Sequence, residues 1–260
     1  MSDYRTLSFQ QSGPVAEIVL DRPDAANGMN DVMTQELAAV AVRCAEPGVK
    51  AVVLTGAGRF FCAGGDLKAM ADSALGPGRF VKGIADDLHR AIATFARMDA
   101  VLITAVNGVA AGAGFSLAIA GDLVLAADTA SFTMAYTKAG LSPDGSASYY
   151  LPRLVGLRRA ADLMLTNRSL SAAEAADWGL VNEVVAGTEL RERAQALAAQ
   201  FARAATGSSS AVKKLLLASF GNEIEDQMDY ESQLIAACAE SSDGREGIDA
   251  FLEKRPPRFG

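Results

Sequence analysis

Two patterns of apolar residues run through the first part of the chain. Short apolar runs rich in β-branched residues predict strands, and longer segments with apolar residues three and four positions apart predict helices. The expected strands are residues 4–10, 15–20, 49–55, 101–106, 123–126, 131–133 and 182–185. The expected helices are residues 30–44, 80–98, 115–120, 160–166 and 171–178. Glycine and proline interrupt residues 68–80, which predicts either a surface loop or a lid over a site.

The pattern changes after residue 188, where only helical spacing remains. Helices are expected at residues 189–205, 209–220, 222–241 and 244–252. No low-complexity linker separates this region from the preceding one. We therefore expect a core of residues 1–187 that carries the site, followed by a helical region of residues 188–260.

Residues 101–122 predict a strand, a glycine-rich turn and a helix in succession. Gly108, Gly112 and Gly114 lie among small residues between two apolar runs. Glycine lets the backbone approach a ligand closely, and the start of a helix leaves N–H groups unpaired. The same spacing also fits tight packing of two elements. It does not match the dinucleotide-binding fingerprint, and no Walker lysine follows.

A second glycine-rich segment, residues 56–65, follows the strand expected at residues 49–55. Phe61 stands where a nicotinamide-binding loop would have its third glycine, so this segment does not fit that class of site either. Two strand-to-glycine units in one chain suggest two backbone N–H donors that converge on one atom. An oxyanion hole has this arrangement.

Composition narrows the classes of function. Half of the 260 residues are hydrophobic, the formal net charge is −7, and the pI is about 4.9. An acidic chain without a basic patch argues against nucleic-acid binding. Cys44, Cys62 and Cys238 lie far apart, which predicts reduced thiols in a cytoplasmic protein. The first residues lack the pattern of a signal peptide and no apolar run is long enough to span a membrane, so no membrane partner is expected.

Two motifs, FFCAGGDL at residues 60–67 and AVNGVAAGAGFSLAIAGD at residues 105–122, resemble those of the crotonase superfamily, the enoyl-CoA hydratase/isomerase family. The likeness covers the chain from IVLDRPDAANGMN to EGIDAFLEKRPPRF. It implies an α/β fold of the crotonase (ClpP/crotonase) type, a spiral of ββα repeats followed by a helical C-terminal region. It also implies an acyl-CoA substrate, with coenzyme A as part of that substrate and no tightly bound cofactor. The implied assembly is a homotrimer or a dimer of trimers.

The resemblance also assigns residues to the site. The backbone N–H groups of Gly65 and Ala113 would hold the thioester oxygen. Coenzyme A would contact Ala25, the loop around Gly65 and, where the C-terminal region closes over the adenine, Phe251 and Lys254. The loop residues are Ala63, Gly64, Gly65, Asp66 and Leu67. No cluster of His, Cys and Asp has the spacing of a metal site, so no metal is expected.

The acid/base group is where the sequence departs from the hydratases of the family. Those members carry glutamates at the positions of Ser116 and Tyr136. In this chain we expect Ser116 and Tyr136 only to line the substrate site. The segment around Asp144 is similar to the 1,2-epoxyphenylacetyl-CoA isomerases and Δ3,Δ2-enoyl-CoA isomerases, in which the aspartate is the acid/base. One carboxylate suffices to remove a proton at one carbon and return it at another. We therefore expect double-bond isomerisation with Asp144 as the acid/base.

Other interpretations stay open. Asp144 precedes a glycine in a Ser-Pro-Asp-Gly turn, so by itself it also fits an ordinary turn aspartate. Residues 146–181 are similar to 4-chlorobenzoyl-CoA dehalogenase, which implies a nucleophilic Asp144 with His89, the single histidine, beside the substrate. A lone histidine on a helix is also commonly a surface or packing residue. A hydratase with a non-standard site and an acyl-CoA-binding protein without turnover are the remaining alternatives.

Overall fold

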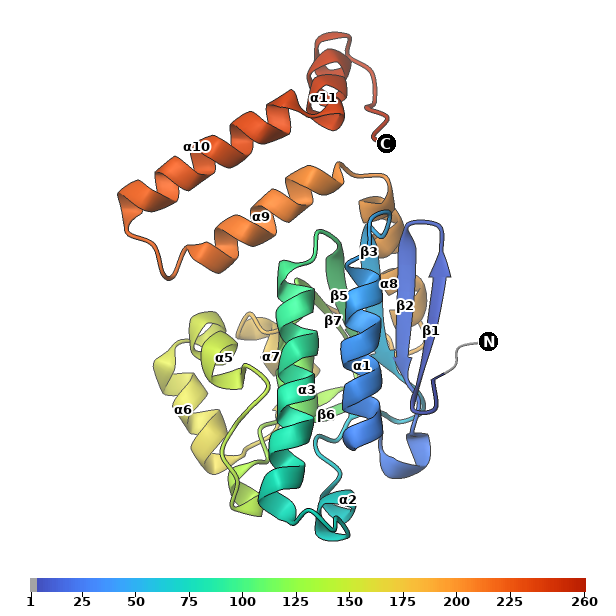
Figure 1. Ribbon diagram of the computed structural model, residues 1–260, viewed down its shortest axis with the longest axis vertical. Helices are drawn as coiled ribbons and strands as arrows, with labels where there is room; N and C mark the ends of the chain where they lie inside the picture. Colours follow the sequence, from blue (N-terminus) through green and yellow to red (C-terminus); the bar gives the residue numbers. More distant parts are fainter. Residues whose placement is uncertain (1–3) are drawn as a thin grey trace.

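A computed structural model describes residues 4–260, in which a six-stranded sheet forms the centre of the fold (Figure 1). The first three residues of the expected core lie outside the described residues. The strand order is β1 (Leu7–Ser12), β2 (Val15–Leu20), β3 (Ala51–Gly56), β5 (Val101–Val106), β7 (Leu123–Ala127) and β10 (Glu183–Val185). The β1–β2 pair is the predicted antiparallel hairpin, and all other neighbours in this sheet are parallel.

A smaller sheet repeats the order of the larger one. Its strands are β4 (Phe60–Cys62), β6 (Val109–Ala111), β8 (Ser131–Thr133) and β9 (Leu170–Ser171). Each of β4, β6 and β8 follows a strand of the large sheet by a few residues, and the three are parallel. Helices follow these pairs: α2 (Leu67–Ala71) and α3 (Pro77–Arg97), then α4 (Ala113–Ile119), then α5 (Ala147–Val155). This succession is a spiral of ββα units, so the expected crotonase-like α/β fold is confirmed.

Helices cover both faces of the large sheet. On one face α1 (Asp31–Cys44) and α3 lie side by side, and on the other α8 (Leu190–Ala202) packs against β3 and β5 (Figure 1). Every residue of β5 is buried. A strand enclosed on both faces explains why residues 101–106 form a continuous apolar run rather than an alternating one.

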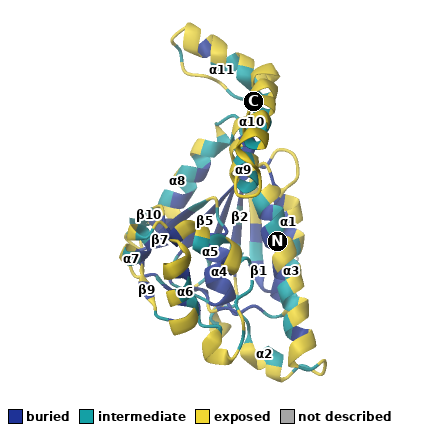
Figure 2. Ribbon diagram, turned by 90° about the vertical axis from the view of Figure 1, so that its left-hand side faces the viewer, coloured by how far each residue is buried: buried dark blue, intermediate teal, exposed yellow. Residues whose placement is uncertain are grey.

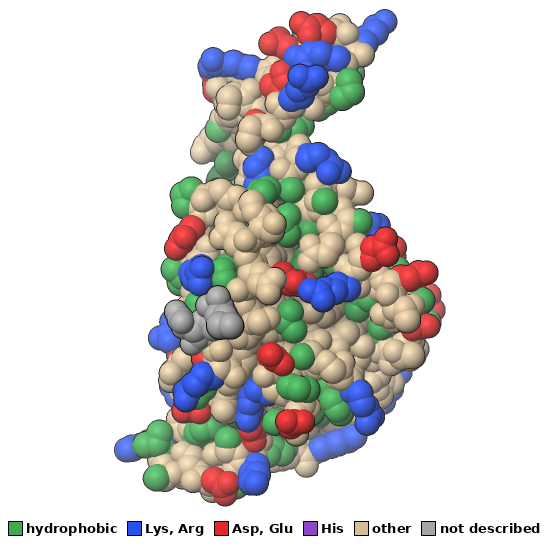
Figure 3. All heavy atoms as spheres, turned by 90° about the vertical axis from the view of Figure 1, so that its right-hand side faces the viewer, with side chains coloured by type: hydrophobic (Ala, Val, Ile, Leu, Met, Phe, Trp, Pro, Cys, Tyr) green, Lys and Arg blue, Asp and Glu red, His purple; other side chains and the backbone are tan. Residues whose placement is uncertain are grey.

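The C-terminal helices extend away from this core. They are α9 (Thr206–Ala218), α10 (Ile224–Glu240) and α11 (Ser242–Leu252). None of the residues of α10 is buried, and Figure 2 shows this helix mostly in the colour of exposed residues. Figure 3 shows the outer end of the molecule joined to the body through a narrower region. The large apolar side chains that are more than half exposed here include Ile224, Met228, Ile235, Ile248, Phe251 and Leu252.

Several elements differ from the sequence predictions. Strands β4, β6 and β9 were not predicted, since each is only two or three residues long. The segment 68–80 contains α2 and the first turn of α3, because Pro77 fits the first position of a helix. Helix α5 was not predicted, since it follows strong turn signals and contains Pro152, which interrupts helical hydrogen bonding. The remaining elements are η1 (Pro23–Ala25), η2 (Thr137–Ala139), α6 (Leu157–Thr166) and α7 (Ala172–Asp177). Within residues 4–260, no helix combines the length and apolarity that crossing a membrane requires.

Candidate active site

A small cavity of about 120 Å³ opens where the two glycine-rich segments meet the loop before α5. Its walls are mostly apolar, and Asp144 is the only carboxylate among the described residues that line it. The lining residues are Ala63, Gly64, Gly65, Leu67, Met70, Val81, Ile84, Gly112, Ala113, Ala135, Tyr136, Ala139, Leu141 and Asp144. The structure therefore brings Gly65, Ala113 and Asp144, the three expected catalytic residues, to one cavity.

The loop of Gly65 is held by a parallel bridge to Met29. The Met29 N–H donates to the Gly64 carbonyl oxygen at 2.8 Å, and the Asp66 N–H donates to the Met29 carbonyl oxygen at 2.9 Å. These two bonds use the groups on either side of Gly65. Among the described backbone groups, none accepts from the Gly65 N–H, which is left for a ligand in the cavity.

Asp66 fixes the far side of this loop. Its Oδ1 accepts the Ala69 N–H at 3.0 Å and so caps α2, while its Oδ2 lies 3.0 Å from an Arg22 guanidinium nitrogen. Burial opposes the ionisation of Asp66, but the Ala69 N–H and Arg22 outweigh it and hold the pKa of this carboxyl below its usual range. The same guanidinium donates to the Gly28 carbonyl oxygen, next to Met29. Arg22 thereby connects the segment of Met29 with the segment of Gly65 and Asp66 through hydrogen bonds to both.

The second donor is at the beginning of α4. Ala113 is the first residue of this helix, so its N–H has no acceptor within the helix. Gly112 precedes it with a φ of 52°, and the Gly112 N–H donates to the Thr133 carbonyl oxygen at 2.9 Å. A side-chain carbon placed on Gly64 would lie 3.3 Å from the Ala113 nitrogen. The two donor loops are thus in direct contact.

Gly114 shows why this segment needs small residues. A side-chain carbon at this position would lie 2.1 Å from the Cys62 carbonyl oxygen, so α4 packs backbone against backbone on β4. The tight-packing interpretation of the glycine pattern therefore applies, and the approach of backbone to a ligand stays a prediction. Cys62 itself is a packing residue, and its burial raises the pKa of the thiol to about 12.

Asp144 is held by side chains from two other elements. The Tyr136 hydroxyl donates to Asp144 Oδ1 at 2.6 Å, and the Ser116 hydroxyl donates to the Asp144 carbonyl oxygen at 2.9 Å. The two hydroxyl oxygens are 3.0 Å apart. Burial, and then the charge of Asp144, raise the pKa of Tyr136, so its phenol remains a donor. Within residues 4–260, Asp144 Oδ2 has no hydrogen-bond partner.

The structure differs from the expected substrate lining at two of three residues. Tyr136 lines the cavity, whereas Ser116 is fully buried beneath it, because the turn at Asp144 covers this part of α4. His89 lies behind that turn, where its Nε2 accepts the Gly145 N–H at 3.1 Å. It lines a separate hollow of about 520 Å³ instead.

The residues expected to bind coenzyme A fall into two groups. Ala63, Gly64, Gly65 and Leu67 line the cavity, Asp66 lies between them, and Ala25 is close because the Ala63 N–H donates to the Ala26 carbonyl oxygen at 3.0 Å. Phe251 and Lys254 are at the end of α11, at the opposite end of the molecule from α2 (Figure 1). The Phe251 side chain is 83% exposed. One chain alone therefore does not bring both groups together.

The apolar wall contributed by α2 and α3 was predicted only in part: Leu67 was expected at coenzyme A and residues 68–80 as a surface loop or a lid, whereas Val81 and Ile84 were not expected at the site. Leu67 and Met70 are three residues apart, as are Val81 and Ile84, and all four line the cavity. Their helical spacing was the available signal, but the glycines and prolines between the two pairs obscured it.

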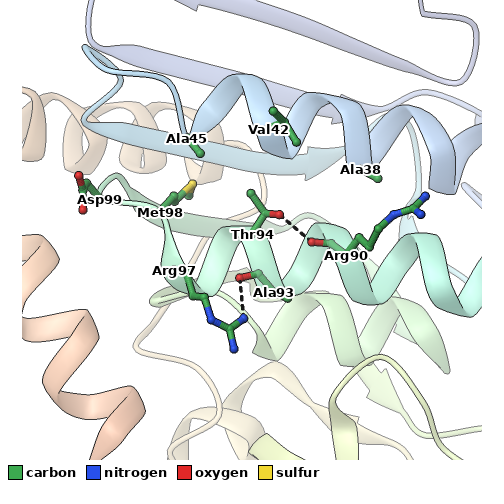
Figure 4. A pocket seen from close by; sticks show the side chains of 9 residues that line it. All are labelled: Ala38, Val42, Ala45, Arg90, Ala93, Thr94, Arg97, Met98 and Asp99. Atoms are coloured by element: carbon green, nitrogen blue, oxygen red, sulfur yellow. Dashed lines mark hydrogen bonds between the residues drawn. The ribbon is translucent and has the colours of Figure 1, made fainter.

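A larger hollow of about 590 Å³ lies over α1 and α3 (Figure 4). Two of its polar side chains are bonded within α3: the Thr94 hydroxyl donates to the Arg90 carbonyl oxygen, and Arg97 donates to the Ala93 carbonyl oxygen. Asp99 accepts from Ser210 on α9. None of the three expected catalytic residues, Gly65, Ala113 and Asp144, is among the described residues that line this hollow. Throughout the described part of the chain, no three His, Cys, Asp or Glu side chains come close enough to hold a metal ion.

Comparison with known proteins gives concordant results over nearly the whole chain. The family model for enoyl-CoA hydratase/isomerase matches residues 10–260. A protein of Rhodobacter capsulatus named as a probable enoyl-CoA hydratase is 40% identical over 256 residues, which cover 98% of both chains. The 1,2-epoxyphenylacetyl-CoA isomerase of Escherichia coli is 38% identical over 258 residues and 97% of both chains. The crystal structure of an enoyl-CoA hydratase from Polaromonas sp. matches with a TM-score of 0.92 and 31% identity, covering 98% of this chain and 99% of that one.

Proposed function

The chain belongs to the enoyl-CoA hydratase/isomerase family, and from this premise we propose that it is an acyl-CoA isomerase that moves a carbon–carbon double bond along an enoyl-CoA. The observation that carries the proposal is the single carboxylate, Asp144, in a cavity that also holds two unpaired backbone N–H groups. One base and an oxyanion hole are sufficient for a proton shift. Addition of water by two glutamates would require a second carboxylate.

The two N–H groups would act on the thioester oxygen. Removal of a proton from the α- or γ-carbon places negative charge on that oxygen as an enolate. The donors of Gly65 and Ala113 belong to loops in direct contact, so they need little rearrangement as the charge develops. Each such fixed donor stabilises the transition state by ~3 kcal/mol.

Asp144 would carry the proton. Tyr136 holds Oδ1, which leaves Oδ2 free to accept a proton from one carbon. When the α-proton leaves, the electron pair of its C–H bond forms an enolate that is conjugated with the existing β–γ double bond. As the thioester carbonyl re-forms, this pair becomes the new α–β double bond, and the electrons of the old double bond form the new C–H bond at the γ-carbon. Oδ2 then returns the proton to that carbon. The net isomerisation consumes no water and needs no oxidant or metal.

The residues at the two hydratase positions support this assignment. Ser116 is buried and occupied with the Asp144 carbonyl oxygen, and Tyr136 is a phenol whose pKa is raised by burial. Neither group can act as a general base near neutral pH. His89 faces Gly145 rather than the cavity, which argues against the hydrolytic role that the dehalogenase likeness implies.

We also propose that the active form is a homotrimer or a dimer of trimers. Phe251 and Lys254 would then close over coenzyme A bound to a neighbouring copy, which would explain why they lie far from the cavity of their own chain. The exposed apolar side chains of α10 and α11 would be covered in the same assembly. Sedimentation of the protein at micromolar concentration should give the mass of a trimer or a hexamer, and a monomer would contradict the proposal.

The test of the reaction is proton exchange. In D2O, with 3-enoyl-CoA thioesters of several chain lengths, the wild-type protein should form the 2-enoyl isomer and place deuterium at the α- and γ-carbons. Asp144→Asn keeps the shape but loses the base, so it should lower the rate by ~10²–10⁴-fold with little change in thioester affinity.

The matched control for this test is Asp72→Asn, which changes an exposed aspartate at the end of α2 and should not alter the rate. Equal exchange in wild type and Asp144→Asn would overturn the role of Asp144. A hydrated product from wild type would instead identify a hydratase, and affinity without any turnover would identify a binding protein.

A further inference from the structure

The turn that carries Asp144 is bonded to a distant helix through a single imidazole. His89, on α3, accepts the Gly145 N–H on Nε2 at 3.1 Å. Gly145 directly follows Asp144. We propose that His89 is a positioning residue for Asp144, held neutral with its proton on Nδ1. The inference rests on the proposed function, in which Asp144 moves the proton.

The hydrogen bond fixes the state of the ring. A backbone N–H is only a donor, so Nε2 has to be the acceptor and cannot carry a proton. A neutral imidazole with one unprotonated nitrogen then carries its proton on Nδ1. Protonation of Nε2 would bring two donors face to face and remove the bond. The turn would then lose its hydrogen bond to α3.

The turn depends on such bonds because its backbone is strained. Gly145 and Ser146 have φ values of 59° and 67°, and the second is unusual for a residue with a side chain. A side-chain carbon on Gly145 would lie 2.8 Å from the Ser116 side chain and 3.3 Å from Leu88 on α3. The turn is therefore packed between α3 and α4, and its polar groups are hydrogen-bonded to both helices.

Three bonds fix separate parts of the turn. Ser116 holds the Asp144 carbonyl oxygen, Tyr136 holds Oδ1, and His89 holds the next N–H. Val81 and Ile84 lie on the same helix as His89 and form part of the cavity wall. His89 thereby sets the position of Asp144 relative to the wall that contacts the substrate.

Charged and titratable groups surround the imidazole on several elements. On α3, Asp86 precedes His89 by three residues, and Arg90 follows it in the helix. Arg97, Tyr149 and Tyr150 line the same hollow as His89. Asp144 itself lies one residue from the bonded N–H.

The first test needs no enzymatic activity. His89 is the only histidine in the chain, so tag-free protein labelled with [¹⁵N]histidine gives the signals of this one ring. At pH 8 we expect a pyrrole-type signal from Nδ1 and a pyridine-type signal from Nε2. The opposite assignment, or rapid averaging of the two, would overturn the proposal whether or not the protein is an isomerase.

The second test separates an acceptor from an acid/base group. His89→Gln can present its side-chain oxygen to the Gly145 N–H, whereas His89→Met has similar size and no acceptor. We expect His89→Met to lower kcat roughly tenfold at constant KM, as loss of one hydrogen bond would do, and His89→Gln to recover most of that loss. The control Arg90→Gln alters the exposed neighbouring residue and should keep the wild-type rate.

The comparison of the two variants decides between these roles of His89. An equal loss of kcat in His89→Gln and His89→Met would show that the imidazole ring itself moves protons and would overturn the proposal. An unchanged kcat in His89→Met would overturn it as well. Loss of activity in Asp144→Asn tests the proposed function separately.

Discussion

The donor loops and the Asp144 turn hold their reactive groups in different ways. Gly65 and Ala113 offer main-chain N–H groups, and their places are fixed by the bridge to Met29 and by the contact of α4 with β4. Asp144 offers a side chain, and its place is fixed by hydrogen bonds from Tyr136, Ser116 and His89. The donors therefore depend on how closely the backbone packs, whereas the base depends on particular side chains.

The largest effect is expected where packing of the donor loops is broken. In Gly114→Val the new side chain would collide with the Cys62 carbonyl oxygen, whose distance from an added carbon is only 2.1 Å. Backbone has to move at both loops, so we expect no stable folded protein, or a loss of at least ~3 kcal/mol of unfolding free energy. Thermal and urea unfolding followed by circular dichroism measure this.

The matched control is Gly83→Ala, on the exposed face of α3, where an added carbon meets nothing within 4 Å. Alanine forms helix better than glycine, so this variant should be more stable by about 1 kcal/mol. Equal stability of Gly114→Val and wild type would show that the contact between α4 and β4 does not fix the donor loops.

The next effect is expected where one donor is removed without disturbing the packing. Ala113→Pro deletes the N–H at the first position of a helix, where proline is tolerated. We expect kcat to fall by ~100-fold or more, because one donor to the enolate oxygen is lost. Gly65→Pro is the corresponding change in the other loop. A correctly folded Ala113→Pro protein with wild-type kcat would show that this N–H does not contact the oxygen.

The smallest effect is expected at the base, where one of its supports is removed. Tyr136→Phe deletes the donor to Asp144 Oδ1 and leaves the carboxylate, so kcat should fall roughly tenfold while proton exchange continues. Because burial and the Asp144 charge raise the pKa of Tyr136, the hydroxyl stays protonated as the pH rises. The ratio of the wild-type kcat to the Tyr136→Phe kcat should therefore remain constant into the alkaline range.

Rates measured from pH 7 to pH 10 on both proteins provide the check. Complete loss of exchange in Tyr136→Phe would identify the phenol, rather than Asp144, as the proton carrier. Restoration of the wild-type rate by Tyr136→Trp, which has a different donor in the ring, would support a purely positional role.

Local patterns predicted the two strands that lead into glycine-rich segments, because each of these units is contiguous in the sequence. A strand followed by glycines indicates where backbone comes close to other groups, as residues 101–114 show. The supports of the base could not be predicted in this way, since His89 and Gly145 are 56 positions apart and belong to different elements. Pro152 and the preceding turn residues also hid the helix that follows Asp144.

The C-terminal helices show a second limit of the sequence. Their spacing predicted α9, α10 and α11 closely, yet it gave no indication that α10 would bury none of its residues within its own chain. An apolar helix face indicates that something covers it, but it does not indicate which surface does so.

Main-chain donors have an evolutionary consequence. Mutation changes side chains, so the N–H groups of Gly65 and Ala113 survive nearly every substitution that the packing accepts. Ser116, Tyr136 and Asp144 come from three elements, yet the hydroxyl oxygens of the first two are 3.0 Å apart and the Tyr136 hydroxyl is 2.6 Å from Asp144 Oδ1. A carboxylate introduced at position 116 or 136 would therefore lie close to Asp144. If the proposed roles hold, a single replacement at one of these positions would change the acid/base groups of the cavity and leave the two main-chain donors unchanged.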